Sequence, residues 1–495
     1  MQGKDILVEL ETMPVGRFHY KLLLAAGLGW AFDSMDTGLI AFLMPKLAQE
    51  WQLSAGAIGL LGSIGLIGMA IGAILAGALA DHWGRKRVFA AMVILYSLAS
   101  ALCALAPSYT WLVCFRFLVG LGLGGELPVA ATLVTEYIPT RVRGRFVVLL
   151  ESFWAVGWLL AAGLTYGIAL DFGWRVAFLI GALPAIYVGL IRMHLPESVR
   201  FLLSKGKIDE AQAIICSIEE SVGRGLNKKA LLREMEKLVV RDEYEATKGD
   251  KNGRMDEGNS VAIEAVNPIG QSRIKDDVRN GKERELVNKG RTEVKQKISV
   301  MGLWTKAFRQ STLMLWITWF GLMFSYYGIF MWLPQLVYQH GFSMTKSAAY
   351  VLVMTLAQLP GYGAAAYLVE HWGRKYTFVI FLLASGLAAW FFGGADSLSS
   401  LLLWGTLMSF FNLGAWGVIY AYTPELYPTY IRGLGSGWAA GLGRLGGMAA
   451  PLLVGFLLSQ AWMVSQIFLL FAFVFLMAAA AVLFLGTETK GKRLD

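Results

Sequence analysis

The sequence predicts an all-α membrane protein with twelve transmembrane helices in two six-helix halves. Composition, a series of long apolar runs and an internal repeat support this prediction. Of the 495 residues, 56% are hydrophobic and only 16% are charged, a balance that is unusual for a soluble domain. The 56 glycines are typical of membrane helices that pack closely against one another.

Apolar runs of about 20 residues recur along the chain, and each is long enough to cross a bilayer. In the first half we expect spans near 20–43, 54–80, 88–106, 111–137, 146–169 and 175–195. In the second half we expect them near 312–334, 347–369, 376–394, 399–422, 433–458 and 463–486.

Two motifs occur twice at the same spacing. His-Trp-Gly-Arg-Lys begins at His82 and again at His371, and Glu-x-x-Pro-Thr begins at Glu136 and again at Glu425. The offset is 289 residues in both cases (371 − 82 and 425 − 136). Two motifs at one offset indicate an internal duplication. Many membrane transporters are built from such duplicated bundles, with the site between the halves.

The net charge of +9 does not indicate nucleic-acid binding, because the basic residues gather in alternate loops. They cluster at 85–87, 141–145 and 374–375, whereas loops such as 106–110 and 393–400 have almost none. This positive-inside pattern places both termini in the cytoplasm, in an inner or plasma membrane. Residues 1–17 are polar and precede a full-length span, so we expect no cleavable signal peptide. The three cysteines suggest neither a disulfide nor a metal cluster.

The chain divides into three parts. Residues 1–196 form an N-terminal six-helix bundle, 197–310 a cytoplasmic linker and 311–495 a C-terminal six-helix bundle. Apolar spacing in the linker predicts amphipathic helices at 204–222 and near 231–239. From about 246 to 300 the composition predicts disorder. A solvated linker is the simpler interpretation, and a regulatory tail is the alternative.

The segment from Gly77 through Asp81 to Arg87 resembles the loop signature of the major facilitator superfamily, with His82 where Arg is usual. The match follows the second span, recurs in the other half and covers the chain except about 220–300. It implies the major facilitator fold and transport by alternating access. We find no catalytic set, metal spacing or nucleotide motif, so we expect no enzyme activity and no cofactor, with a proton gradient as the energy source.

Further motifs narrow the resemblance. The segments 196–202 and 487–491 are similar to those of sugar porters and their organic-ion relatives. The first span, 32–38, resembles that of bacterial niacin permeases and metabolite:proton symporters, and aromatic-acid symporters have a similar aspartate pair. Sugar porters have amides in the seventh span where this chain has the aromatic segment 320–327. The resemblance implies proton symport of a small organic monocarboxylate, with nicotinate as the leading candidate. A benzoate-like acid or a sugar, and a non-transporting receptor, are the alternatives.

Charges inside spans each cost about 2.5–3.5 kcal/mol on insertion scales and therefore need a function. We identify Asp33, Asp36, Arg116, Glu126 and Arg444. Asp36 and Arg116 both lie in the outer halves of their spans and could meet. In sugar porters an Asp and an Arg at matching positions resemble a proton-coupling pair. A static salt bridge is the alternative.

Arg444 is the clearest indication of the substrate. Its guanidinium fits a carboxylate bidentately, and the glycines around it leave space. Pairing with a buried acid such as Glu126 or Asp33 is the alternative. Asp33 and Glu126 are also candidates for contact with substrate, with proton acceptance by Asp33 and helix packing by Glu126 as their other possible roles.

Aromatic and amide side chains complete the expected binding site. A flat ring could stack among aromatics in the cavity-lining spans, although such residues are also ordinary packing. The candidates are Trp154, Trp158, Phe324, Tyr326, Tyr327, Trp416 and Tyr420. Asn412 could bond a ring nitrogen or carboxylate, and Gln358 is a weaker candidate.

We expect the repeated loop motifs to form a gate at the cytoplasmic helix ends. The alternative is that they serve only membrane insertion and topology. The candidates are Asp81, Arg85, Glu136 and Arg143, and their counterparts Glu370, Arg374, Glu425 and Arg432. The partners we expect are a small organic anion, protons and the lipid bilayer, with no nucleic acid, around a monomeric protein.

Overall fold

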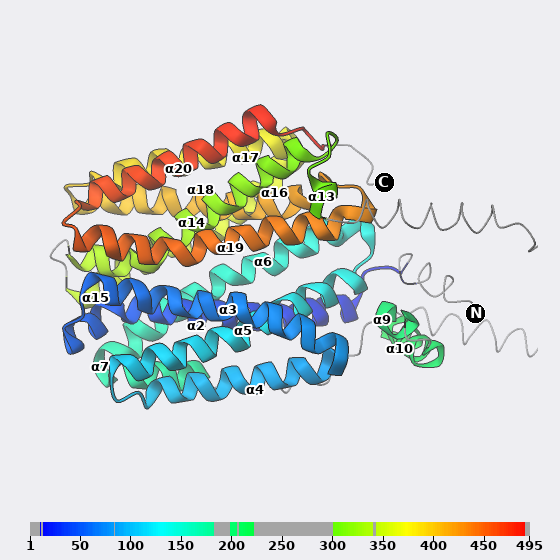
Figure 1. Cartoon of the computed structure of the whole chain (residues 1–495), viewed down its shortest axis with the longest axis horizontal. Helices are drawn as coiled ribbons and strands as arrows, with labels where there is room; N and C mark the ends of the chain where they lie inside the picture. Colours follow the sequence, from blue (N-terminus) through cyan, green and yellow to red (C-terminus); the bar gives the residue numbers. More distant parts are fainter. Residues whose placement is uncertain are drawn as a thin grey trace, which may run out of the picture.

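The chain folds into a bundle of long helices in a computed structural model. The structure describes residues 10, 13–83, 85–182, 199–204, 207–221, 300–339 and 343–490. In Figure 1 the blue and cyan helices of the first half lie against the green, yellow and red helices of the second. The described residues contain helices and no strand, which confirms the predicted all-α class.

Five long helices make up the described part of the first half. They are α2 (Arg17–Trp51), α3 (Ala55–Trp83), α4 (Arg85–Ala104), α5 (Tyr109–Tyr137) and α6 (Thr140–Leu164). A π-helical turn, η1 (Thr165–Ala169), and α7 (Leu170–Phe172) continue α6. Residues 174–182 are helical, and the rest of the predicted sixth span lies outside the described residues.

The second half repeats this plan. Its long helices are α14 (Arg309–Gln339), α15 (Met344–Leu356), α16 (Gln358–Trp372), α17 (Arg374–Gly393), α18 (Leu398–Glu425), α19 (Thr429–Ser459) and α20 (Val464–Leu485). One predicted span is divided into α15 and α16. Pro360 explains the break, because its ring lacks an N–H and would clash with the carbonyl four residues earlier, at Leu356, where α15 ends.

Helix boundaries recur at the spacing of the repeated motifs. Arg85 begins α4 and Arg374 begins α17, while Thr140 begins α6 and Thr429 begins α19. Both pairs are 289 residues apart (374 − 85 and 429 − 140). The sequence repeat is therefore also a repeat of helix boundaries.

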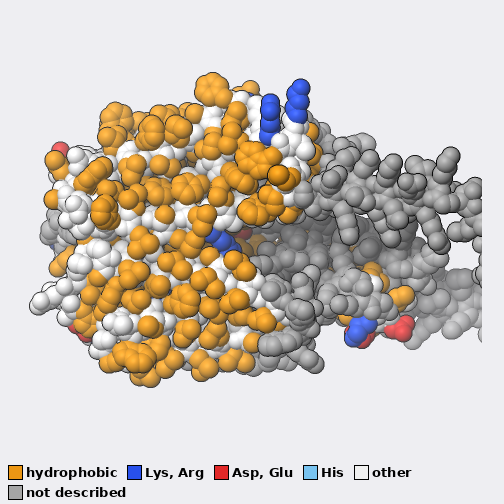
Figure 2. All heavy atoms as spheres, in the orientation of Figure 1, with side chains coloured by type: hydrophobic (Ala, Val, Ile, Leu, Met, Phe, Trp, Pro, Cys, Tyr) orange, Lys and Arg blue, Asp and Glu red, His pale blue; other side chains and the backbone are white. Residues whose placement is uncertain are grey.

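The outside of the bundle is suited to lipid. Eight helical segments of the described residues, one of them formed by α15 and α16 together, are long and apolar enough to cross a membrane. Large apolar side chains such as Ile74, Leu98, Trp390 and Phe484 are exposed. Figure 2 shows hydrophobic side chains over most of the visible flank of the bundle. Exposed apolar surface on this scale marks a membrane-facing flank rather than a surface in water.

The two halves meet where α2 and α3 pack against α14 and α19. A Cβ atom on Gly59 would lie 2.6 Å from the carbonyl oxygen of Pro451, and one on Gly455 would lie 2.5 Å from that of Ala55. The Trp332 indole also donates to the Pro451 carbonyl, at 3.2 Å. We call this the closed end of the bundle, because the backbones of α3 and α19 touch there. The opposite end, where α17 begins and α18 ends, is the motif end.

Short helices occur in the predicted linker. They are α9 (Val199–Ser204), α10 (Ile208–Ser221) and α13 (Val300–Leu303). The amphipathic helix α10 lies within the predicted range 204–222 and buries Ala211, Ile215 and Ile218. The second predicted helix, near 231–239, and the segment 246–299 lie outside the described residues.

Candidate functional site

A buried ion pair joins helices of the first half. Arg116 Nη1, on α5, lies 2.6 Å from Asp36 Oδ2, on α2, and the side chains are 3% and 1% exposed. Ser100, on α4, donates to Asp36 Oδ1 at 3.3 Å. Arg116 also lines a narrow crevice together with Met331 of α14, so the pair faces the seam between the halves. The structure thus brings together the two residues that the sequence proposes for proton coupling.

Asp33 lies on the same helix as this pair and is also buried, at 2% exposure. Asp33 and Asp36 both act electrostatically on the hydroxyl group of Tyr96. The backbone carbonyl of Asp33 accepts a hydrogen bond from Thr37 at 3.0 Å. Asp33 therefore belongs to the polar interior of the first half.

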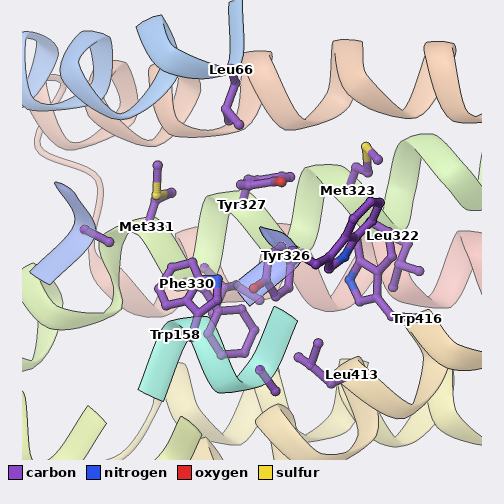
Figure 3. Close-up of a cluster of buried hydrophobic side chains, with 14 of the residues drawn as sticks. Leu66, Trp158, Leu322, Met323, Tyr326, Tyr327, Phe330, Met331, Leu413 and Trp416 are labelled. Atoms are coloured by element: carbon purple, nitrogen blue, oxygen red, sulfur yellow. The ribbon is translucent and has the colours of Figure 1, made fainter. Parts of the chain in front are cut away.

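Tyr326 is the centre of an aromatic cluster between the halves (Figure 3). Trp154, on α6, donates its indole N–H to the Tyr326 hydroxyl at 2.8 Å, so this hydrogen bond crosses from one half to the other. Edge-to-face contacts join Tyr326 to Trp158 and Trp416, with ring centroids 6.1 and 5.6 Å apart. Tyr327 packs edge-on at 5.1 Å. Such contacts hold the rings in fixed positions.

Phe324 lies elsewhere, although the sequence groups it with these aromatics. Its ring stacks on Phe320, with centroids 5.8 Å apart, and packs against Phe471 of α20 at 5.7 Å. Phe324 and Tyr326 are two residues apart, which places them on opposite faces of α14. Phe324 therefore packs inside the second half, away from the seam.

Arg444 offers an unused donor beside this cluster. Its Nη1 atom is buried and has no hydrogen-bond partner among the described residues. The neighbouring Gly447 packs against the ring of Tyr327, and Arg444 acts electrostatically on the hydroxyls of Tyr327 and Tyr420. A buried donor without a partner is costly, so such a group is suited to binding an anion.

Two buried amides lie in α16 and α18. Gln358 and Asn412 are both fully buried, and neither amide oxygen nor amide nitrogen has a partner within the described part of the chain. Asn412 is one turn from Trp416, so both occupy one face of α18. Amides in this position can donate and accept hydrogen bonds toward a polar ligand.

Sequence inspection missed Glu151. This residue of α6 is 6% exposed and is the one charged residue within the apolar run 146–169. It acts electrostatically on Tyr327, Tyr362 and Tyr420. A charge inside an apolar run is the signal that could have identified Glu151, as it identifies the other intramembrane charges.

At the motif end, polar contacts tie the helices of the second half together. Arg374, at the start of α17, forms an ion pair with Glu425, at the end of α18, with Nη2 and Oε1 2.9 Å apart. The Thr489 hydroxyl donates to the other oxygen of Glu425 at 2.5 Å. Glu488 accepts the backbone N–H groups of Arg374 and Lys375 at 2.9 and 3.0 Å. The segment after α20 thereby caps α17.

This capping changes the titration of Glu488, which lies beyond the last span. Partial burial alone would raise the pKa of Glu488, but the backbone N–H donors of Lys490, Arg374, Lys375 and Thr489 outweigh it and lower the pKa below its ordinary value of 4.5. The carboxylate form is therefore the one that holds the cap.

The other expected gate residues are placed as follows. Arg432 donates from Nε to the backbone carbonyl of Tyr427 at 3.1 Å. Glu370 is exposed and forms no ion pair with the described residues. The side chains of the first-half candidates Asp81, Arg85, Glu136 and Arg143 lie outside the described residues, as does that of Glu126.

Comparison with known proteins agrees with this architecture. The sequence matches the family described as Major Facilitator Superfamily over residues 26–364 and the family described as Sugar (and other) transporter over residues 259–495. The inward-open structure of the xylose transporter XylE from E. coli has the same fold, with a TM-score of 0.67 over 96% of this chain and 98% of that one at 18% identity.

Several relatives with closer sequences are transporters. The niacin transporter NiaP of Acinetobacter baylyi is 47% identical over 99% of both chains. The putative niacin/nicotinamide transporter NiaP of Bacillus subtilis is 41% identical over 96% of this chain and 98% of the other. The benzoate transport protein of Acinetobacter baylyi is 28% identical over 89% of this chain and 84% of that protein. The predicted twelve-helix fold and the transporter class are confirmed, and the chain belongs to the major facilitator superfamily.

Proposed function

We propose that this protein imports nicotinate together with protons by alternating access. The observation that carries the proposal is Arg444, a partly buried side chain whose Nη1 donor is buried and has no partner among the described residues, one turn from Gly447, which packs against Tyr327, in a chain 47% identical to a niacin transporter. Arginine stays charged and fits a carboxylate with two parallel hydrogen bonds. The aromatic cluster around Tyr326 supplies faces and edges for a flat ring.

Asn412 would add a polar contact to this site. Both of its amide atoms lack partners among the described residues although the side chain is fully buried. A ligand that bonds them would remove the cost of leaving them unsatisfied. Trp416, one turn away, would lie against the ring of the same ligand.

Proton coupling is assigned to Asp36 opposite Arg116. At about 4 Å and an effective dielectric near 20, two unit charges attract by about 4 kcal/mol. Protonation of Asp36 would remove most of this attraction. Inverting a 1:99 population requires about 5.5 kcal/mol. One proton could therefore supply much of the bias between inward-facing and outward-facing states.

Orientation follows from the basic loops. With the motif end in the cytoplasm of an inner membrane, both termini would be cytoplasmic and the closed end would face outward. The conformation described would then be closed to the outside. The contacts of Arg374 and Glu425 would stiffen the inner ends of the second half while the halves rock. In this proposal the protein is a monomer. Its N-terminal bundle ends at residue 196, and its linker ends at residue 310.

A benzoate-like acid is the second candidate, because a benzoate transport protein is 28% identical to this chain. Competition distinguishes the candidates. Purified protein in liposomes should take up labelled nicotinate, and excess unlabelled nicotinate should block uptake more effectively than benzoate, while xylose should not compete. Uptake blocked best by benzoate would favour the second candidate, and block by xylose would favour a sugar. Ligand binding without any flux would favour a receptor.

A further inference from the structure

Glu151 is a buried carboxyl that none of the roles above employs. It precedes Trp154 by three residues and Trp158 by seven, so the three side chains share one face of α6. Trp154 and Trp158 both contact Tyr326 of the second half. This face of α6 therefore points into the seam between the halves. Glu151 lies one helical turn closer to the motif end than Trp154.

Two tyrosines, Tyr327 and Tyr420, connect Glu151 with Arg444. Tyr327 and Tyr420 each respond electrostatically to the Glu151 carboxyl and to the Arg444 guanidinium. The packing agrees with this, because Gly447, one turn from Arg444, lies against the Tyr327 ring, and Tyr327 packs against Tyr326, which Trp154 on the Glu151 face of α6 contacts. Glu151 nevertheless forms no ion pair with Arg444 or with any other described residue. Both groups are therefore free of an ion pair that a ligand would have to break.

The surroundings of Glu151 favour a neutral carboxyl. The titratable groups of the packed helices that interact electrostatically with Glu151 are Tyr327, Tyr362 and Tyr420, and Arg444 acts on two of these, Tyr327 and Tyr420. The Trp30 indole lies beside it without the geometry of a hydrogen bond. An isolated carboxylate is costly in a membrane interior. It would also repel the carboxylate that Arg444 binds, whereas a protonated carboxyl offers an O–H donor.

We propose that Glu151, in its protonated form, recognises the ring nitrogen of the substrate while Arg444 holds the carboxylate. This inference rests on the proposed function and deepens it, because it makes the substrate class pyridine carboxylates rather than aromatic acids in general. Nicotinate carries a ring acceptor that benzoate lacks. A site that hydrogen-bonds a substrate group discriminates against the analogue without it, because the donor is then left unpaired.

Two substitutions separate this role from packing. Glu151→Gln replaces the O–H donor by an N–H donor on a side chain of similar shape and should keep the preference for nicotinate over benzoate. Glu151→Leu removes the donor and should weaken nicotinate binding about ten- to a hundredfold while leaving benzoate binding within about twofold. Ser152→Ala is the matched control, because the Ser152 hydroxyl bonds to the Leu149 carbonyl within α6. It should leave both affinities unchanged.

The experiment is a competition assay with labelled nicotinate on full-length protein in nanodiscs, with benzoate and N-methylnicotinate as competitors. The N-methyl compound has no free ring lone pair and should compete at least tenfold less well than nicotinate against the wild type. Equal competition by the N-methyl compound would overturn the inference, and so would an unchanged nicotinate preference in Glu151→Leu. Equal loss of both ligands in Glu151→Leu would indicate a structural role and contradict it. Absence of nicotinate binding to the wild type would instead refute the proposed function.

Discussion

The guanidinium of Arg116 and the carboxylate of Asp36 form a buried ion pair at 2.6 Å between α5 and α2. The pair lies beside a crevice that Met331 of the second half also lines. Its carboxylate is further bonded by Ser100. A change of charge at Asp36 would therefore be felt both within the first half and at the seam where the halves move.

Replacing Asp36 by Asn should abolish proton-driven accumulation and leave exchange of labelled for unlabelled substrate. The Asn side chain cannot gain or lose the proton, while the binding residues stay in place. Removal of one partner from a buried pair costs about 3–5 kcal/mol, so thermal stability should also fall. Ser100→Ala, which removes only a 3.3 Å hydrogen bond, should retain coupling. Accumulation by Asp36→Asn would contradict the coupling role.

Replacing Arg444 by Ala should weaken nicotinate binding by about thirtyfold or more, because truncating one partner of a hydrogen-bonded charged contact costs about 2–5 kcal/mol. Equilibrium binding to protein in nanodiscs measures the effect. Arg309→Ala is the control, since Arg309 is exposed at the start of α14 and should bind substrate normally. An unchanged affinity in Arg444→Ala would move the carboxylate site elsewhere.

Replacing Tyr326 by Phe removes the acceptor for the Trp154 indole, which then loses a 2.8 Å hydrogen bond between the halves. We expect the conformation with a packed closed end to lose about 1–3 kcal/mol. Because the balance between the conformations changes, the uptake rate should differ from that of the wild type. A double-mutant cycle with Trp154→Phe provides the check, because coupled residues give non-additive effects. Strict additivity would show that the bond carries no energy between the halves.

Replacing Gly59 by Val should prevent the closed end from packing. Even the first side-chain atom would lie 2.6 Å from the Pro451 carbonyl oxygen. Uptake should fall severalfold, and thiol labelling of a cysteine introduced at Leu61 should rise. Gly56→Ala is a matched control one turn earlier on α3, where an added Cβ meets nothing within 4 Å. Normal uptake by Gly59→Val would mean that this contact is not needed for transport.

Replacing Glu488 by Gln should lower the melting temperature at pH 7 and have progressively less effect in acid. The folded-state pKa of Glu488 lies below its ordinary value of 4.5. Its contribution to stability is therefore present above that value and is lost as the pH falls through the folded pKa. Melting curves of both proteins from pH 7 to pH 3 should converge at the acid end. A constant difference across this range would show that the carboxylate is not the stabilising form.

The fold was predictable from sequence because lipid imposes long apolar runs and the duplication repeats its motifs at a fixed offset. Intramembrane charges were equally informative, since each one must have a function. Residue spacing along one helix could not show which neighbouring helix a side chain would face. For this reason the sequence groups Phe324 with Tyr326, although Phe324 packs against Phe471 of α20. Likewise, only the three-dimensional arrangement shows that Glu151 and Arg444 act electrostatically on the same tyrosines.

Gradient-driven uptake tests the central claim most directly. Purified protein in liposomes, with a fluorescent pH indicator inside, should accumulate labelled nicotinate above the external concentration when the outside is acidic. The interior should acidify in step with uptake, and a protonophore should abolish the accumulation. Uptake that only equilibrates, with or without the gradient, would contradict proton symport.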